Sequence, residues 1–227
     1  MRPVLPLLAL CAVLCAACHN DYTPKPTAYL RIDMPEHEYQ FVDTLPVSDS
    51  GLGAAGVTLP FLFEANRCAE LALKRPRQVA TVEDYGTMTG TRPVRLKEGR
   101  FNEVWLDIMY PRWNGVVFLT YRHLPSPDSL RSQVDESMRL LEQHYSVASG
   151  IEEQGYEDAE HRVYGTVYYL GGSRVASTCQ FWLTDSSRHF LRGALFLNAV
   201  PNNDSLAPVV DYLQTDIEHL VETLRWR

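Results

Sequence analysis

The chain begins with one short apolar run, and no later stretch is long enough to span a membrane. Arg2 precedes this run, which extends from Val4 to Ala17 and is interrupted only by Pro6. Its length is typical of a secretory signal peptide and falls short of the roughly 18 apolar residues that a membrane-spanning helix needs. We therefore predict that residues 1–17 are a signal peptide and that the remainder folds without a transmembrane helix.

Cys18 is the candidate lipid anchor. It follows the small residues Ala16 and Ala17 and precedes the polar segment 19–21, a pattern typical of a bacterial lipobox. Each buried methylene of its acyl chains, such as palmitate, would contribute about 0.8 kcal/mol to membrane binding. The alternative is cleavage by the signal peptidase of soluble proteins, which leaves Cys18 as an ordinary thiol. Because no acidic run follows Cys18, we expect an anchor in the outer membrane that faces the periplasm.

The composition is that of a globular protein. Of the 227 residues, 45% are hydrophobic and 22% are charged, which is close to the average for folded domains. The formal net charge of −7 disfavours nucleic acid as a partner, because that binding depends on clustered Lys and Arg. Residues 18–60 are polar or rich in glycine and proline without periodicity, so we predict a lipidated tether, a strap and a flexible linker there. Residues 61–227 are predicted to form a single domain.

Apolar periodicity becomes clear in the second half of the chain. Five segments have the alternation or the apolar runs typical of strands, namely 104–109, 116–121, 164–170, 179–183 and 191–197. The first two are expected to form a hairpin around Gly115. Two segments have the spacing of amphipathic helices that begin at Ser or Asp caps, namely 126–145 and 204–224.

This order of elements predicts the α+β class. We expect an antiparallel sheet with two long amphipathic helices packed on it, which either cover one face or flank the sheet. The order also resembles the α/β/α sandwich of the PsbP and Mog1 proteins. Likeness of fold does not determine function.

Common catalytic signatures are missing from the sequence. No phosphate-binding loop, dinucleotide-binding turn, nucleophile elbow or zinc-binding helix string occurs, so no cofactor or metal is expected. Asp185, Ser186 and His189 form the one tight Asp-Ser-His group. The favoured interpretation is a connection between strands in which Asp and Ser bond their own backbone, and a catalytic triad is the less favoured one.

Three further residues are candidates for covalent chemistry. Cys68 and Cys179 remain once Cys18 is lipidated, and in an oxidising periplasm they would either form one disulfide or stay as two buried thiols. Thr44 lies in an Asp-Thr-Leu triplet of the kind that carries O-linked glycans in some bacterial periplasms. The two other such triplets coincide with predicted helix starts, so Thr44 is the better acceptor.

Several strings together resemble the GldD lipoproteins of gliding Bacteroidetes. In chain order they are Tyr22-Thr-Pro-Lys-Pro with Arg31-Ile32-Asp33, Trp105-Leu-Asp-Ile-Met-Tyr-Pro111, Gln180-Phe-Trp-Leu-Thr-Asp-Ser186, Phe190-Leu-Arg-Gly-Ala-Leu195 and Pro201-Asn-Asn-Asp-Ser-Leu-Ala-Pro208. The resemblance implies a non-enzymatic lipoprotein that is required for gliding motility and for assembly or stability of the type IX secretion machinery. It would act through contacts with other envelope proteins and brings no catalytic residues.

The candidate partner-binding residues are polar or aromatic and lie within or beside these strings: Tyr22, Lys25, Arg31, Asp185 and Arg192. Charge-assisted bonds that fix loops are an equally good interpretation for Arg31, Asp185 and Arg192. Two alternative functions stay open. One is a periplasmic enzyme with a site near Asp185, His189 and Arg192. The other is a small-ligand carrier whose cavity would be lined by aromatic residues, namely Trp105, Trp113, Tyr168 and Trp182.

Overall fold

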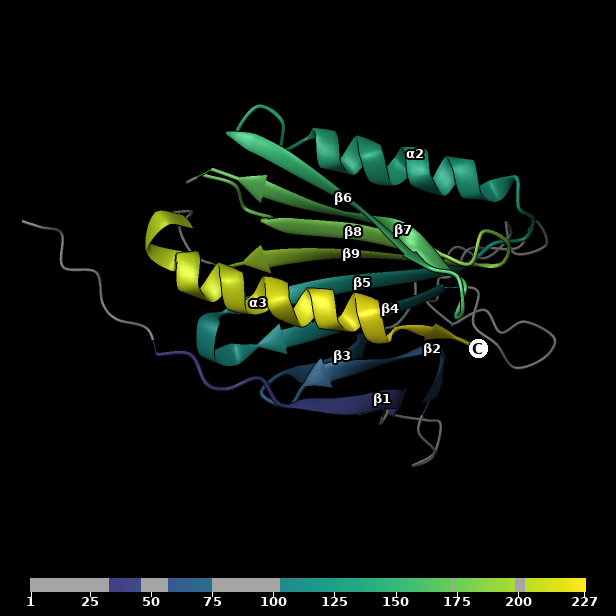
Figure 1. Ribbon diagram of the computed structural model, residues 1–227, viewed down its shortest axis with the longest axis horizontal. Helices are drawn as coiled ribbons and strands as arrows, with labels where there is room; N and C mark the ends of the chain where they lie inside the picture. Colours follow the sequence, from purple (N-terminus) through teal and green to yellow (C-terminus); the bar gives the residue numbers. More distant parts are fainter. Residues whose placement is uncertain (1–32, 46–56, 75–102, 173, 199–202) are drawn as a thin grey trace, which may run out of the picture. The chain divides into compact units, whose positions relative to one another are not determined.

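The computed structural model describes residues 33–45, 57–74, 103–172, 174–198 and 203–227 (Figure 1). These residues belong to one compact unit, residues 32–227. Within the described ranges no helix has both the length and the apolar character needed to cross a membrane. Cys18, Tyr22, Lys25 and Arg31 lie outside the described residues.

Seven strands form the larger sheet, in the order β3-β4-β5-β9-β8-β7-β6, and every neighbouring pair is antiparallel. Their bounds in that order are Glu70–Lys74, Glu103–Tyr110, Gly115–His123, His189–Leu197, Cys179–Thr184, Val163–Gly171 and Gly150–Asp158. All five strands predicted from periodicity are present, and β4 and β5 pair as the predicted hairpin. The α+β class is confirmed.

A second, three-stranded sheet has the order β1-β2-β10, with bounds Tyr39–Leu45, Val57–Asn66 and Arg225–Trp226. The helices are η2 (Pro111–Trp113, 3-10), α2 (Ser129–Glu142) and α3 (Asn203–Thr223). Aromatic rings join the two sheets: the centroid of Phe61 on β2 lies 5.7 Å from that of Tyr121 on β5. The three-stranded sheet therefore packs against the larger one through the core.

The two helices cover opposite faces of the larger sheet. Tyr168 and Tyr169 are consecutive residues of β7, so their side chains point to opposite faces. The Tyr168 hydroxyl lies 3.2 Å from the sulfur of Met138 on α2, whereas the Tyr169 hydroxyl donates to Glu218 on α3 at 2.7 Å. Of the two arrangements left open by the sequence, the helices flank the sheet. Figure 1 shows α3 in front of the central strands.

Helix α3 completes the main core. Its apolar stripe buries Val209, Leu213, Ile217, Leu220 and Val221 against the sheet. This is the stripe predicted from the 3.6-residue period. Beneath α2, on the other face, a smaller cluster forms around other buried side chains, namely Leu141, Tyr168, Leu170 and Val175.

The prediction of a tether, strap and flexible linker over residues 18–60 is wrong where two strands lie within this range. Residues 42–45 belong to β1 and residues 57–60 to β2, and Val42, Leu45 and Leu59 are buried in the core. The β1–β2 register shifts between Val42 and Thr44. Such an irregularity breaks the two-residue alternation by which a strand is recognised. Residues 46–56 lie outside the described residues.

The first helix is shorter than predicted. A helix was expected over residues 126–145, but α2 begins at Ser129 and ends at Glu142. Before it, the N–H of Ser129 donates to the Ser126 carbonyl as part of a turn. After it, Tyr145 is 51% exposed and does not continue the buried stripe. The chain must reverse direction there to enter β6.

Gly193 lies where the core has no room for a side chain. It is opposite Phe181 in the β8–β9 register, and a Cβ at Gly193 would overlap atoms Cε1 and Cζ of the Phe181 ring. Gly193→Ala is therefore expected to lower the free energy of unfolding by about 1–3 kcal/mol, the usual cost of overpacking. Urea denaturation would measure this loss.

The matched control is Gly155→Ala on β6, where an added Cβ meets no atom within 4 Å. That variant should be as stable as the wild type or slightly more so, since alanine restricts the unfolded chain. Equal losses for the two variants would contradict the steric explanation.

Candidate functional site

Asp185 is used to build the β8–β9 turn. Its Oδ1 accepts hydrogen bonds from the backbone N–H groups of Ser187, Arg188 and His189 at 2.9, 2.7 and 2.8 Å. Its Oδ2 accepts from the Ser187 hydroxyl at 2.6 Å. Asp185 is only 4% exposed. Burial tends to raise the pKa of Asp185, but these donors, beginning with the Ser187 hydroxyl, outweigh it and lower the pKa to about 2.

His189 belongs to a different contact network from the Asp185 carboxylate. Its Nδ1 lies 2.9 Å from the Tyr121 hydroxyl, and its ring stacks on Trp226 with centroids 5.2 Å apart. The carboxylate bonds the backbone of His189, and the ring nitrogen Nδ1 bonds Tyr121. This geometry is that of a structural turn, in agreement with the favoured interpretation of the sequence.

Arg192 lies on β9 on the side of the sheet that α2 covers. Its Nη2 donates to Oε1 of Gln180 at 2.7 Å, and burial lowers the pKa of the guanidinium. Gln180 Nε2 and Trp182 Nε1 have no hydrogen-bond partner among the described residues. Asp185 is bonded by the groups of its own turn, and Arg192 is bonded by Gln180 on the neighbouring strand. The two residues therefore have separate partners within the fold and do not form one site.

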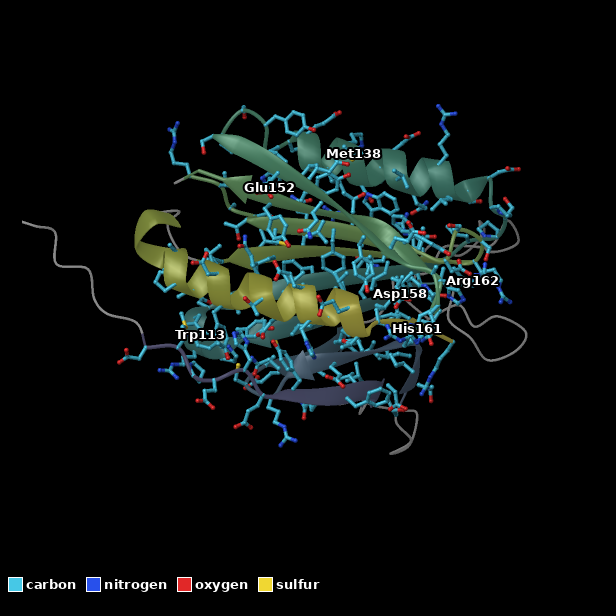
Figure 2. All side chains as sticks on the ribbon, viewed as in Figure 1. Trp113, Met138, Glu152, Asp158, His161 and Arg162 are labelled. Atoms are coloured by element: carbon cyan, nitrogen blue, oxygen red, sulfur yellow. The ribbon has the colours of Figure 1, made fainter. Side chains whose placement is uncertain are left out.

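A second polar cluster lies beside the Asp185 turn and binds the C-terminal strand; we call it the lock and define it as Asp158, His161, Arg162 and Trp226. Figure 2 labels Asp158, His161 and Arg162 close together. His161 Nδ1 is 2.8 Å from Asp158 Oδ2. Arg162 Nη2 donates to the Asp185 carbonyl at 3.2 Å, and its own carbonyl accepts from Trp226 Nε1 at 3.1 Å. The sequence did not predict the lock, because Trp226 is 64 residues from Arg162 in the chain.

The most extensive polar cluster joins the beginning of the described chain to α3. We call it the clasp and define it as His37, Asn66, Tyr212 and Asp216. His37 Nδ1 lies 2.7 Å from Asp216 Oδ1, and its ring stacks on Tyr212 with centroids 4.0 Å apart. Asn66 Nδ2 lies 3.0 Å from both Asp216 oxygens and 2.8 Å from the Tyr212 hydroxyl.

The clasp extends along the helix by one further pair of rings. Tyr39 stacks on His219 with centroids 3.5 Å apart, and His219 Nε2 is 2.8 Å from Glu64 Oε2. Burial raises the pKa of Tyr212 to about 12, so this phenol is neutral at physiological pH. Asp216 is 4% exposed on a largely apolar helix face. A buried carboxylate needs such partners, because it loses its hydration on folding.

The clasp holds residues 33–38, which we call the N-terminal arm. In sequence, the arm continues the segment that leads from Cys18 into the domain. It is also bound through Arg112, whose Nη2 donates to the Asp33 carbonyl at 3.4 Å. The sequence signal for this site was the polar residues Tyr212, Asp216 and His219, spaced one turn apart in an otherwise apolar stripe.

The two cysteines are free thiols, so the disulfide considered from the sequence is not formed. Cys179 is buried at the start of β8 and Cys68 is exposed in the turn before β3. Four strand spacings of about 4.8 Å, or roughly 19 Å, separate β3 from β8, and a disulfide requires Cα atoms within about 7 Å. Burial raises the pKa of both thiols. The alternative of two buried thiols holds for Cys179 alone.

Comparison with known protein families gives one match. The model of the family described as gliding motility lipoprotein GldD matches residues 19–226. The chain belongs to the GldD family. It is accordingly a lipid-anchored protein of the cell envelope that takes part in gliding motility. No curated protein and no solved structure matches it, so the likeness to the PsbP and Mog1 sandwich stays a prediction.

The family match contains every candidate residue except Cys18. Three strings that suggested GldD from the sequence are now placed: 105–111 is β4 with the start of η2, 180–186 is β8 with the Asp185 turn, and 190–195 is the middle of β9. Because β8 and β9 are neighbours, two of these strings form the centre of the GldD sheet.

Thr44 is exposed in this GldD chain, but it lies in β1 and not in the loop that the sequence suggested. The neighbouring Asp43 carboxylate lies 2.7 Å from Arg227 Nη2, and this contact lowers the pKa of Asp43. Glycosylation of Thr44 stays a prediction.

Proposed function

We propose that this GldD-family protein is a non-enzymatic scaffold of the envelope, required for gliding motility and for assembly or stability of the type IX secretion machinery. It would be held by acyl chains on Cys18 in the outer membrane, with the domain in the periplasm. The observation that carries the proposal is the family match, which runs from residue 19 to 226 and covers the whole folded unit.

The use of the polar groups supports a scaffold over an enzyme. The Asp185 carboxylate is occupied by donors from its own turn, and the Asp216 carboxylate by His37 and Asn66. Cys68 is exposed as a residue, but its sulfur is partly covered 3.9 Å from the Tyr212 hydroxyl, and this partial burial raises the pKa of the thiol and opposes formation of the thiolate nucleophile. These groups stabilise the fold, and contacts at the surface would perform the function.

The anchor is tested by Cys18→Ala. Without acyl chains the domain loses the methylene burial that holds it to the bilayer, so most of it should move from the membrane to the soluble fraction. Cell fractionation and immunoblotting measure the distribution. Cys68→Ala, which removes an exposed free thiol, is the matched control and should stay with the membrane. Full membrane retention of Cys18→Ala would refute the anchor.

The cellular role is tested by deleting the protein and restoring either the wild type or the Cys18→Ala variant. The deletion should abolish colony spreading, reduce the amount of type IX cargo in the medium, and lower the abundance of machinery components in quantitative proteomics. Wild-type protein should restore all three. A deletion strain with normal cargo secretion and normal component levels would contradict the secretion part of the proposal.

A further inference from the structure

A groove runs between the edge strand β6 and helix α3. Two adjoining cavities form it, of about 540 Å³ and 160 Å³, and Tyr169 lines both. Its apolar surface comes from Val167 on strand β7 and from Val210 and Val221 on α3. The two cavities together therefore form an open groove with an apolar floor.

The charge along this groove has one sign. Four carboxylate residues line it, namely Glu152, Asp211, Glu218 and Glu222. No described residue that lines either cavity is Lys, Arg or His. Figure 2 labels Glu152 on β6, opposite α3. A cleft lined by one sign of charge concentrates the field and attracts groups of the opposite sign.

Strand β6 leaves one backbone edge open. It is the last strand of the sheet, pairs with β7, and within the described part of the chain has no strand on its outer side. A row of unpaired N–H and C=O groups at such an edge is a template for another strand. Peptide recognition by strand addition uses this kind of edge.

Gly155 lies in the middle of this edge strand without an internal reason for glycine. A Cβ there would meet no atom within 4 Å, and its backbone is not in the left-handed region. Glycine inside a strand costs roughly 0.5–1 kcal/mol relative to alanine. Such a glycine often marks a place where another backbone approaches closely. Alternation places this open position on the face of β6 that carries Glu153 and Glu157, opposite the groove.

We propose that β6 and this groove bind an extended basic segment of another envelope protein. The segment adds as a strand to β6 and places Lys or Arg side chains against the carboxylates of α3, with apolar side chains over the floor. The inference rests on the proposed scaffold function and names the surface through which it acts.

The spacing of the acidic residues favours an extended partner. Glu218 and Glu222 are one helical turn apart, about 6 Å along the axis at 1.5 Å per residue. Alternate residues of a strand are about 6.8 Å apart and share one face. Two basic residues at positions i and i+2 of a strand along α3 would therefore reach both carboxylates, and a third would reach Asp211, about 10.5 Å further along the helix.

Binding is tested with the purified lipoprotein in detergent and a labelled decapeptide of alternating Lys and Val. Fluorescence anisotropy should show binding that weakens as salt is raised, and no binding of the matched Glu-Val peptide. Hydrogen exchange should show protection of amides in residues 150–158 when the Lys-Val peptide is present. Absence of protection in β6 would overturn strand addition.

The decisive variant changes one carboxylate on each side of the groove, on β6 and on α3. Glu152→Lys with Glu222→Lys should weaken peptide binding at least tenfold. The matched control is Glu153→Lys with Glu157→Lys: both residues are exposed, and both point to the face of β6 opposite Glu152. It should change the affinity less than twofold. Equal losses in the two charge variants would overturn the groove as the site.

Two further measurements separate the alternatives. Sedimentation that shows a dimer, abolished by the Glu152→Lys, Glu222→Lys variant, would assign the groove to a second copy and overturn the basic partner. Failure of peptide binding with an intact cellular phenotype of the deletion would overturn this inference alone. Normal gliding and secretion in the deletion strain would instead refute the scaffold function, whatever the peptide result.

Discussion

Asp216→Ala is expected to lower the free energy of unfolding by about 1–3 kcal/mol, the usual cost of leaving a buried hydrogen-bonding group without its partner. The 4% exposed carboxylate lies within 3.0 Å of His37 Nδ1 and Asn66 Nδ2. Its removal takes this partner from His37 Nδ1 and leaves Asn66 Nδ2 with the Tyr212 hydroxyl alone. Because His37 belongs to the N-terminal arm, amides of β1 should also exchange faster with solvent.

Urea denaturation and hydrogen exchange measure the two effects. Asp216→Asn keeps an oxygen for Asn66 and should lose less stability than Asp216→Ala. The matched control is Asp211→Ala, an exposed carboxylate on the same helix, which should change stability by less than about 0.5 kcal/mol. A loss below about 1 kcal/mol for Asp216→Ala, with unchanged exchange in β1, would show that the clasp does not hold the arm.

Asp185→Ala is expected to lower the free energy of unfolding by about 2–3 kcal/mol at pH 7. The turn lowers the pKa of Asp185 from 3.8 to about 2, and each pKa unit corresponds to about 1.4 kcal/mol. A carboxyl group whose pKa is lower in the folded state stabilises the protein above its ordinary pKa. That contribution is lost as the pH falls from about 4 through 2.

The pH dependence gives this prediction a distinctive readout. The difference in stability between wild type and Asp185→Ala should be constant from pH 7 to pH 5 and should shrink as the pH falls toward 2. Asp185→Asn retains an acceptor for the backbone N–H groups and should lose less than the alanine variant. Glu157→Ala, an exposed acid on β6, is the control. A difference that is the same at pH 2.5 and pH 7 would show that the ionised carboxylate is not what stabilises the turn.

The sequence predicted local features well and distant contacts poorly. The Asp185 turn was predicted because its donors lie two to four residues away. The clasp was missed because His37 and Asp216 are 179 residues apart, and no period in the sequence connects them. Helix α3 was recognised from its apolar stripe. The partners of its buried Asp216 carboxylate were not predicted.

Three of the strands that escaped prediction, β1, β6 and β10, lack a legible period for physical reasons. β6 carries polar residues on both faces, because Glu152 and Gln154 line the groove and Glu153 and Glu157 are exposed on the other face, so it has no apolar alternation. β10 has two residues and is too short for any period. β1 contains a register shift that breaks its alternation. The candidate groove depends on β6, and the sequence alone therefore did not reveal it.

Local order along the chain was enough to determine the family, the α+β class and the two amphipathic helices, because periodicity and short motifs depend on neighbouring residues. Only the tertiary structure decided that the helices flank the sheet, that Cys68 and Cys179 stay apart, and that the N-terminal arm is held by α3. It also placed the acidic residues of α3 beside the open edge of β6. These outcomes depend on how segments far apart in the chain share one core, and a linear pattern does not contain that information.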